Sequence, residues 1–296
     1  MSSAPEPLVY IDGQFYPKSE AKISVFDHGF LYGDGVFEGI RAYHGQVFLC
    51  PEHIHRLYEG AQCLMIRIPH SKGEMREILY RCLEKNNLRD AYFRLVVSRG
   101  AGDLGLSPKK CGPFGSVTCI CAGIALYPES LYQTGLDVIT VAVPRSHPET
   151  LNPRVKSLNY LPNIMAKIEG HNAGVEEVVM LNHRGEVSEC SGDNLFIVKN
   201  GVVKTPPPSA VILEGCSRNL VIKLARDMGI EVAEPTMARY DLYTADECFC
   251  TGTAAEMIPV VKIDGRVIGD GKPGPVTQAL LAEFRRYIRE YADPGV

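Results

Sequence analysis

The sequence predicts a protein of the α+β class, built from two domains in which strands and helices are mixed. Turn pairs such as Asp12-Gly13 join short stretches of alternating polarity, which is a strong hairpin signal. Other segments repeat apolar residues three and four positions apart, as amphipathic helices do. Both kinds of segment occur in each half of the 296-residue chain, and that length is enough for two ordinary domains.

The composition is that of a globular protein, with 45% hydrophobic and 22% charged residues. No apolar run approaches the roughly 20 residues needed to span a bilayer, and the opening MSSAPEPLVY lacks the features of a signal peptide. We therefore expect a cytoplasmic protein that does not bind membranes. A net charge of −4 argues weakly against a nucleic-acid partner.

The ten cysteines are best interpreted as core residues. Cys119 and Cys121 are spaced by two within an apolar run, as are Cys248 and Cys250, so on a strand both members of a pair face the same side. A metal site is the functional alternative. The C-x-x-C spacing of zinc sites is absent, so we expect no metal.

In the first half, alternation and helical periodicity predict four strand segments and two helices. One helix has Pro51 at its first position, and Ser71 with Glu74 forms a capping-box pair at the start of the next. The strand segments are 8–17, which is a hairpin, 42–49 around Gly45, 92–98 and 116–122.

The second half restarts as a strand after the turn-rich stretch 125–135. A helical pattern from about Tyr160 carries Ile164, Met165 and Ile168 as its apolar residues. Asn200-Gly201 and Asp264-Gly265 are two further hairpin turns. The other strands are predicted at 178–181, 194–198, 202–204, 247–250 and 258–263, and the other helices follow Gly215 and Pro275.

Three segments suggest chemistry, although each also has an ordinary structural explanation. Glu214–Ala225 is a glycine-containing turn that opens a helix, whose N–H groups attract phosphate, but many helices simply begin in this way. Thr251–Glu256 is a small-residue turn that could approach an anion or merely join two strands. Lys156 precedes a predicted helix, where most lysines are solvated surface charges.

Together, these segments resemble the fold-type IV enzymes that use pyridoxal 5′-phosphate (PLP). The first half contributes YGDGVFEGIR and AYFRLVVSRG, and the second contributes KSLNY, SECSG and GTAAE. In this order they resemble the branched-chain amino acid aminotransferases most closely. The resemblance implies a D-amino acid aminotransferase-like fold, with a small N-terminal α/β domain at 1–126, a linker at 127–134 and a large mixed-sheet PLP-binding domain at 135–296.

The resemblance also assigns residues to the cofactor. Lys156 would hold PLP as a Schiff base and then move a proton between the substrate Cα and C4′ of the cofactor. Glu189 would keep the pyridine nitrogen protonated, and Tyr160 would hydrogen-bond the phenolic oxygen. The groups expected to bind the phosphate are the guanidinium of Arg56 and the backbone of Cys216, Ser217 and Thr253.

The substrate residues follow from the same resemblance. The turn at Thr253-Ala254 would bind the α-carboxylate, and Arg94 would meet the distal carboxylate of glutamate. Tyr32, Phe37 and Tyr92 would line an apolar pocket. The implied reaction transfers the amino group of L-leucine, L-isoleucine or L-valine to 2-oxoglutarate, giving branched-chain 2-oxo acids and L-glutamate.

Other functions remain open from the sequence alone. D-amino acid and R-amine aminotransferases and aminodeoxychorismate lyases share the lysine and the glutamate, and Arg99-Gly100 is similar to the D-specific group. A catalytically silent binding protein on this fold is a further alternative, but it would have lost one of the core residues, and all of them are present. By resemblance, we expect at least a homodimer, with small amino acids and 2-oxo acids as the other partners.

Overall fold

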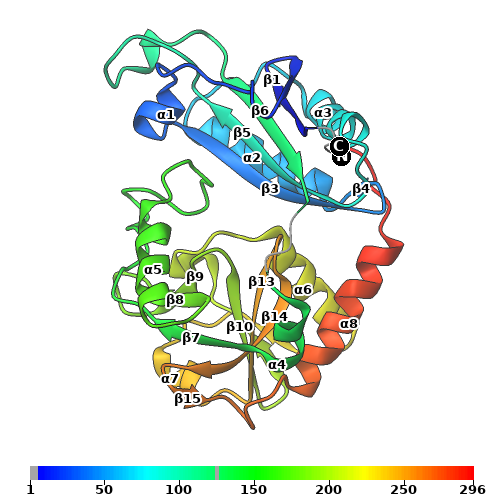
Figure 1. Cartoon of the computed structure of the whole chain (residues 1–296). Coiled ribbons are helices and arrows are strands. Elements are labelled where there is room, and N and C mark those ends of the chain that lie inside the picture. Colours follow the sequence, from blue (N-terminus) through cyan, green and yellow to red (C-terminus); the bar gives the residue numbers. More distant parts are fainter. Residues whose placement is uncertain (1–5, 124–126) are drawn as a thin grey trace. The chain divides into compact units, whose positions relative to one another are not determined.

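The computed structural model describes residues 6–123 and 127–296, and these form two compact units (Figure 1). The first unit holds residues 6–123 together with two later segments, Val155–Asn159 and Arg289–Val296. The second holds residues 127–154 and Tyr160–Ile288. This division differs from the predicted boundaries, because both later segments fall within the stretch assigned to the large domain. The predicted linker also contains a helix, α4, at Glu129–Thr134, while residues 124–126 lie outside the described part.

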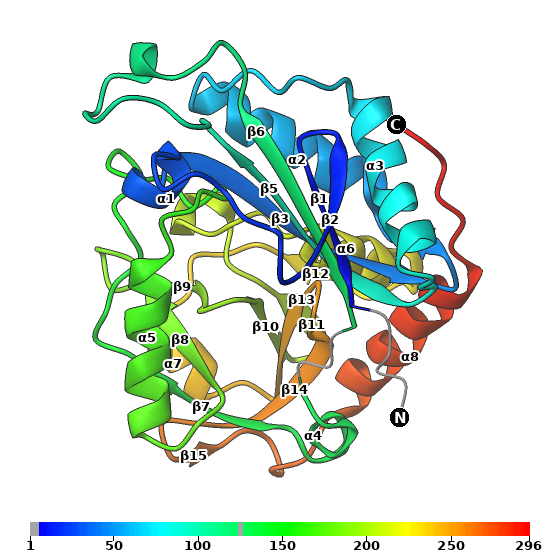
Figure 2. The ribbon, with the colours of Figure 1, turned by 45° about the horizontal axis from the view of Figure 1, so that its top comes forward.

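The first unit is built on an antiparallel sheet whose strand order is β2-β1-β6-β5-β3-β4. Helices α2 and α3 pack on one face of this sheet (Figures 1 and 2). Its elements are β1 (Leu8–Ile11), β2 (Gln14–Pro17), α1 (His28–Tyr32), β3 (Gly35–Tyr43), β4 (Gln46–Val47), α2 (Cys50–Cys63), α3 (Lys72–Lys85), β5 (Ala91–Ser98), the 3₁₀ turn Pro108–Lys110 and β6 (Ser116–Ala122).

Strand alternation in this unit separates a buried apolar face from a partly exposed face that carries predicted site residues. On β5, Phe93, Leu95 and Val97 are fully buried in the core, whereas Tyr92 and Arg94 on the other face are half-buried. The hairpin at Asp12-Gly13, the capping box of Ser71 and Glu74, and strands β5 and β6 are confirmed.

One strand of this unit begins earlier in the sequence than predicted. The segment predicted at 42–49 is the end of a longer strand, β3, which starts at Gly35 and turns at His44-Gly45 into β4. Gly35 and Gly39 have no side chains, so they interrupt the alternation by which a strand is recognised.

The second unit is built on a mixed sheet with strand order β12-β11-β10-β13-β14-β7-β8-β9, and β15 pairs with β14. The parallel pairs are β7 with β8, β7 with β14, and β11 with β12. Besides α4, its elements are β7 (Leu136–Thr140), α5 (Leu161–Asn172), β8 (Glu177–Leu181), β9 (Val187–Cys190), β10 (Asn194–Lys199), β11 (Val202–Lys204), the 3₁₀ turn Pro208–Ala210, α6 (Cys216–Asp227), β12 (Val232–Ala233), α7 (Arg239–Tyr243), β13 (Glu247–Gly252), β14 (Glu256–Ile263), β15 (Arg266–Val267) and α8 (Pro275–Glu290).

Helix α5 buries its small residues and exposes its large apolar residues. Ile164, Met165 and Ile168 are all about half exposed, at 51%, 53% and 52%, while Ala166 and Gly170 are buried. A Cβ at Gly170 would lie 2.5 Å from Val178 Cγ1, so the small residues allow the helix to approach β8 closely. The predicted helix is confirmed, and its three large apolar residues lie outside the core.

The remaining predictions for this unit concern turns, helices and thiols. The hairpins at Asn200-Gly201 and Asp264-Gly265 are confirmed, and Leu280, Phe284 and Ile288 are among the buried residues of α8. Strand β9, which has four residues, was not predicted. The paired cysteines of both units, Cys119 with Cys121 and Cys248 with Cys250, are buried in the two cores, as predicted.

Candidate functional site

In the first unit, an aromatic ring is contacted by two cationic side chains. The Lys156 Nζ lies 4.6 Å from the centroid of the Phe37 ring, and the Arg94 guanidinium carbon lies 4.5 Å from it. The Phe37 N–H donates to the Lys156 carbonyl at 2.9 Å, which ties the lysine to β3. An Arg94 Nη also donates to the Tyr92 hydroxyl, at 3.3 Å. Four predicted site residues therefore lie together in this unit.

The position of Tyr92 depends on a glycine in the neighbouring strand. Gly39 pairs with Arg94 in the β3–β5 register, and a Cβ added at Gly39 would lie 2.1 Å from the Tyr92 hydroxyl oxygen. Because Gly39 has no side chain, the Tyr92 ring can lie across β3 beside Phe37 and Arg94.

Tyr32, the other predicted pocket residue, is held at the end of α1. Its hydroxyl accepts the Gly105 N–H at 3.0 Å, and its ring meets the edge of the His28 ring at 4.9 Å between centroids. The structure therefore joins Tyr32 to the loop around residue 105.

Arg56, predicted to bind phosphate, is held by Glu38, which also contacts His53, and the sequence analysis singled out neither of these two residues. Its Nε and Nη2 each donate to Glu38 at 2.7 Å, and His53 Nδ1 lies 2.8 Å from the same carboxylate. Glu38 is 0% exposed. Burial by itself raises the pKa of Glu38, but the charge of Arg56 and the hydrogen bonds from Arg56 and His53 outweigh it and lower that pKa to about 2.

In the second unit, Glu189 lies on β9 in a cradle formed by Arg145, Asn194 and Leu213. Arg145 makes an ion pair with Glu189 Oε1 at 2.7 Å, and the side chains of both residues are more than 90% buried. The Asn194 amide donates to Glu189 Oε2 at 3.0 Å, and the Leu213 N–H donates to the carboxylate at 3.0 and 3.1 Å. These charge-assisted contacts favour the ionised carboxylate.

The same asparagine brings the start of α6 close to Glu189. The Asn194 amide also donates to the Leu213 carbonyl at 2.8 Å, two residues before the N-cap Gly215. A Cβ at Gly215 would lie 2.1 Å from the Asn194 side-chain oxygen, so glycine is required for this approach. Cys216 and Ser217 are buried in the first turn, and the N–H groups of a first helical turn point toward the N-terminal end of the helix.

The turn between β13 and β14 lies beside this cradle and contains Thr253 and Ala254. Asn194 pairs with Thr251 in the β10–β13 register, and a Cβ at Gly252 would lie 1.8 Å from an Asp193 carboxylate oxygen. Tyr160, also predicted to contact the cofactor, is the partly exposed N-cap residue of α5.

Taken separately, the two units carry the types of group that a phosphorylated aldehyde cofactor with a basic ring nitrogen would use. A primary amine and a largely buried arginine lie in the first unit, and a carboxylate paired with an arginine and a helix start lie in the second. PLP uses these types of group for its aldehyde, its phosphate and its pyridine nitrogen. Within the described residues, no cluster of three His, Cys, Asp or Glu side chains could hold a metal ion.

Comparison with known proteins assigns the class. The chain belongs to amino-transferase class IV, whose family profile matches residues 35–263. A protein of Methanocaldococcus jannaschii, provisionally named a branched-chain-amino-acid aminotransferase, is 54% identical over 94% of this chain and 95% of its own length. The branched-chain-amino-acid aminotransferase of Escherichia coli strain K12 is 35% identical over 96% and 94%.

Solved structures agree with this assignment. The crystal structure of the Escherichia coli branched-chain amino acid aminotransferase matches with a TM-score of 0.93 at 34% identity, over 98% of this chain and 97% of the other. That of the Thermobaculum terrenum branched-chain amino acid aminotransferase, in its PLP form, has a TM-score of 0.86 at 27% identity, over 96% and 94%. The chain therefore belongs to the branched-chain-amino-acid aminotransferase family. The predicted fold-type IV architecture and the predicted enzyme class, PLP-dependent transaminase, are confirmed.

Sequence reasoning missed four polar residues that hold the predicted ones, namely Glu38, His53, Arg145 and Asn194. Glu38 lies inside the YGDGVFEGIR motif, so its place there was an available signal. Arg145 is remote from every motif, and only the tertiary structure shows that it contacts Glu189.

Proposed function

We propose that this chain transfers the amino group of L-leucine, L-isoleucine or L-valine to 2-oxoglutarate through a Schiff base at Lys156. The observation that carries the proposal is the cluster around Phe37, where an aromatic surface is contacted by Lys156 and Arg94. A pocket that accepts both leucine and glutamate needs an apolar wall with one cation at its edge, and this cluster supplies both.

Each residue has a distinct part in the proposed reaction. PLP, when bound, draws electrons away from the substrate Cα. The Lys156 amine would form the covalent link to the cofactor and would then move the proton between Cα and C4′. Glu189, held by Arg145 and Asn194, would keep the proton on the pyridine nitrogen. Tyr160 would donate a hydrogen bond to the phenolic oxygen of the cofactor.

The phosphate and carboxylate groups would be bound by charge and by backbone donors. Arg56 and the N–H groups at the start of α6, from Cys216 and Ser217, bind the cofactor phosphate, and Thr253 adds a further contact. The turn at Thr253-Ala254 binds the substrate α-carboxylate. Tyr32, Phe37 and Tyr92 form the apolar wall, and Arg94 binds the distal carboxylate of glutamate.

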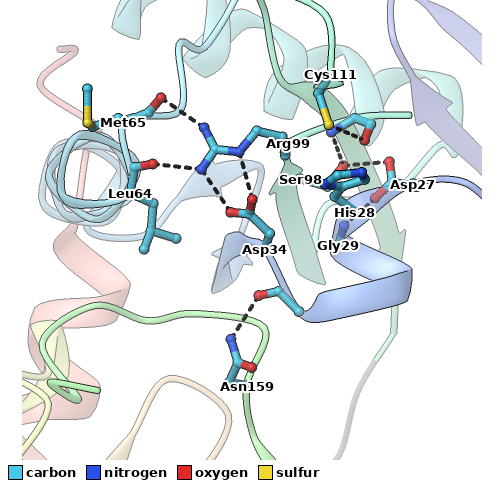
Figure 3. Close-up of polar contacts among 12 residues, drawn as sticks. Asp27, His28, Gly29, Asp34, Leu64, Met65, Ser98, Arg99, Cys111 and Asn159 are labelled. Atoms are coloured by element: carbon cyan, nitrogen blue, oxygen red, sulfur yellow. Dashed lines mark hydrogen bonds and ion pairs between the residues drawn. The ribbon is translucent and has the colours of Figure 1, made fainter. Parts of the chain in front are cut away.

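An amino-donor profile tests the substrate. Purified enzyme is assayed with L-leucine, D-alanine and R-phenylethylamine, each with 2-oxoglutarate as acceptor. L-Leucine is expected to give the highest kcat/KM, and a higher value for D-alanine would overturn the assignment. The Arg99 guanidinium lends no support to a D-specific enzyme, because it is bound to Asp34 and to the carbonyls of Leu64 and Met65 (Figure 3).

We also propose that the chain assembles at least as a homodimer. Large apolar side chains of the first unit are exposed, including Phe26, Phe30, Leu104 and Leu106, and exposed apolar surface favours association. Light scattering on the purified protein should give at least twice the mass of one chain, and a monomeric mass would contradict this.

A cytoplasmic location completes the proposal. All ten cysteines are present as thiols, which suits a reducing compartment. No helix in the described parts of the chain is long and apolar enough to cross a membrane. Cell fractionation should recover the protein with cytoplasmic markers.

A further inference from the structure

The strand β3 carries a charged residue on the face that packs against the helices. Val36, Ile40 and Ala42 are buried in the core of the first unit, and Glu38 follows the same alternation. A carboxylate that is 0% exposed in an apolar layer is costly unless it is paired and hydrogen-bonded.

Both partners of Glu38 come from one helix, α2. The bidentate contact of Arg56 uses its Nε and one Nη, each at 2.7 Å, and His53, one turn earlier, lies 2.8 Å from the Oε2 oxygen. A two-point contact fixes the plane of the guanidinium as well as its position. The Arg56 side chain is 12% exposed, so part of it reaches the surface.

The same strand fixes Lys156 through its neighbouring residues. Val36 forms a β-bridge with Ser157, and the Phe37 N–H donates to the Lys156 carbonyl at 2.9 Å. Three consecutive residues of β3 therefore make these contacts. Val36 and Phe37 contact the segment of Lys156, and Glu38 contacts Arg56. A buried ion pair can often be replaced by apolar residues of similar volume at no net cost in stability, so the presence of this particular pair is better explained by orientation.

We propose that Glu38, with His53, is a positioning residue that orients the Arg56 guanidinium for the cofactor phosphate. This inference rests on the proposed function, in which Arg56 binds that phosphate. Loss of the Glu38 carboxylate should weaken recognition of the phosphate and leave the chemistry at the aldehyde intact.

The test compares PLP with pyridoxal, which has the aldehyde but no phosphate. The dissociation constants of both are measured on apoenzyme from the absorbance of the adduct, and their ratio reports the contribution of the phosphate. Glu38→Gln and Glu38→Asp are each expected to weaken PLP binding about tenfold or more, since each removes or displaces the charged group that holds the Arg56 guanidinium in place. Pyridoxal binding should stay within about threefold of wild type, well short of the tenfold that corresponds to 1.4 kcal/mol. A role in folding alone would weaken both ligands alike.

Asp34→Asn is the matched control. Asp34 forms a bidentate pair with Arg99 in the same unit, with contacts of 2.7 and 2.9 Å, and these contacts hold Arg99 rather than Arg56 (Figure 3). The Asp34→Asn enzyme should lose stability and keep the wild-type ratio of the two dissociation constants. If Glu38→Gln does not fold, Glu38→Asp keeps the charge, and the double variant Glu38→Gln/Arg56→Met removes both partners.

The outcomes separate the inference from the proposed function. If Arg56→Met keeps the wild-type ratio, Arg56 does not bind the phosphate, and that part of the proposed function fails. If Arg56→Met loses the preference for PLP while the Glu38 variants retain it, only the positioning role is overturned. The proposal requires that Glu38→Gln, added to Arg56→Met, changes the ratio no further.

Discussion

The charged side chains of Arg145 and Glu189 are largely excluded from water, so each needs the other as an ion-pair partner. Their ion pair of 2.7 Å is supplemented by the Asn194 amide and the Leu213 N–H, so the carboxylate oxygens are well supplied with donors. Such a network keeps a carboxylate ionised, and an ionised partner is what the pyridine nitrogen of PLP needs in order to stay protonated.

The lysine is the first residue to test. Replacing Lys156 with alanine removes the nucleophile and the proton carrier, so kcat with L-leucine and 2-oxoglutarate should fall by about 10²-fold or more. The phosphate-binding groups remain, so PLP should still bind but should not be fixed to the chain by borohydride. Lys85→Ala, at an exposed position in the last turn of α3, is the control. Near-normal turnover by Lys156→Ala would contradict the proposed role.

Glu38 predicts a dependence of stability on pH. Arg56 and His53 overcome the effect of burial and lower the pKa of Glu38 from 4.5 to about 2. A carboxylate with a depressed folded-state pKa stabilises the protein above pH 4.5 and loses that contribution as the pH falls toward 2. The contribution is on the order of 3 kcal/mol, at about 1.4 kcal/mol per pKa unit.

Urea unfolding of the wild type and of Glu38→Gln between pH 7 and pH 2.5 measures this effect. The difference in unfolding free energy between the two proteins should shrink below about pH 4.5, near the pKa of a free glutamate. A difference that stays constant over this range would show that the charge of Glu38 is unimportant for stability.

At the scale of elements, strand β3 holds groups on both of its faces. One face meets α2 through Glu38, and the other supports Phe37 and, through the gap at Gly39, the Tyr92 ring. The strand is therefore the element on which the first unit organises its predicted site residues.

Gly39→Ala should damage the pocket more than the fold. The new Cβ would meet the Tyr92 hydroxyl at 2.1 Å, and that hydroxyl is hydrogen-bonded to Arg94, so both side chains must shift. We expect kcat/KM for L-leucine and L-glutamate to fall roughly tenfold or more, since displacements of about 1 Å can cost up to 10²-fold.

Gly73→Ala is the matched control for this change. Gly73 lies in α3, and a Cβ there would have no atom within 4 Å. That variant should keep full activity and at least the wild-type stability, because alanine is favoured over glycine in a helix. Equal kinetics for the two variants would mean that Tyr92 and Arg94 are not part of the pocket.

At the scale of the whole molecule, the chain crosses between its units more than once. Val155–Asn159 joins the first unit from the middle of the chain, and Arg289–Val296 joins it from the end. The C-terminal segment is anchored there by Asp293, whose carboxylate accepts from Arg76 at 2.8 Å and from the Tyr80 hydroxyl at 2.6 Å.

Removal of residues 291–296 should therefore destabilise the first unit, although no predicted site residue is deleted. The truncation leaves Arg76 and Tyr80 without this carboxylate and removes the ring of Tyr291, whose centroid lies 5.0 Å from that of Phe48. The thermal midpoint should fall by about 2–4 °C or more, as a loss of 1 kcal/mol does in a protein of 150–250 residues. Circular dichroism measures this, and Asp293→Asn should reproduce part of the loss. An unchanged midpoint would mean that the segment is not docked in solution.

The sequence by itself determined the features that depend on a few neighbouring residues. The turns Asp12-Gly13 and Asn200-Gly201 follow from the backbone freedom of glycine and asparagine, and the capping box at Ser71 follows from local hydrogen bonding. Motifs in order along the chain also predicted the family, because they preserve the residue types that its chemistry requires.

Only the tertiary structure decided which distant residues meet. Glu38 with Arg56 and Arg145 with Glu189 are pairs that no local pattern could join, since the partners of each pair lie in different segments of the chain. The buried face of α5 was decided by the close approach that Gly170 permits, against the preference of its larger apolar residues. Packing and long-range charge act between parts of the chain that are remote in sequence, whereas turn and cap signals act within a few residues.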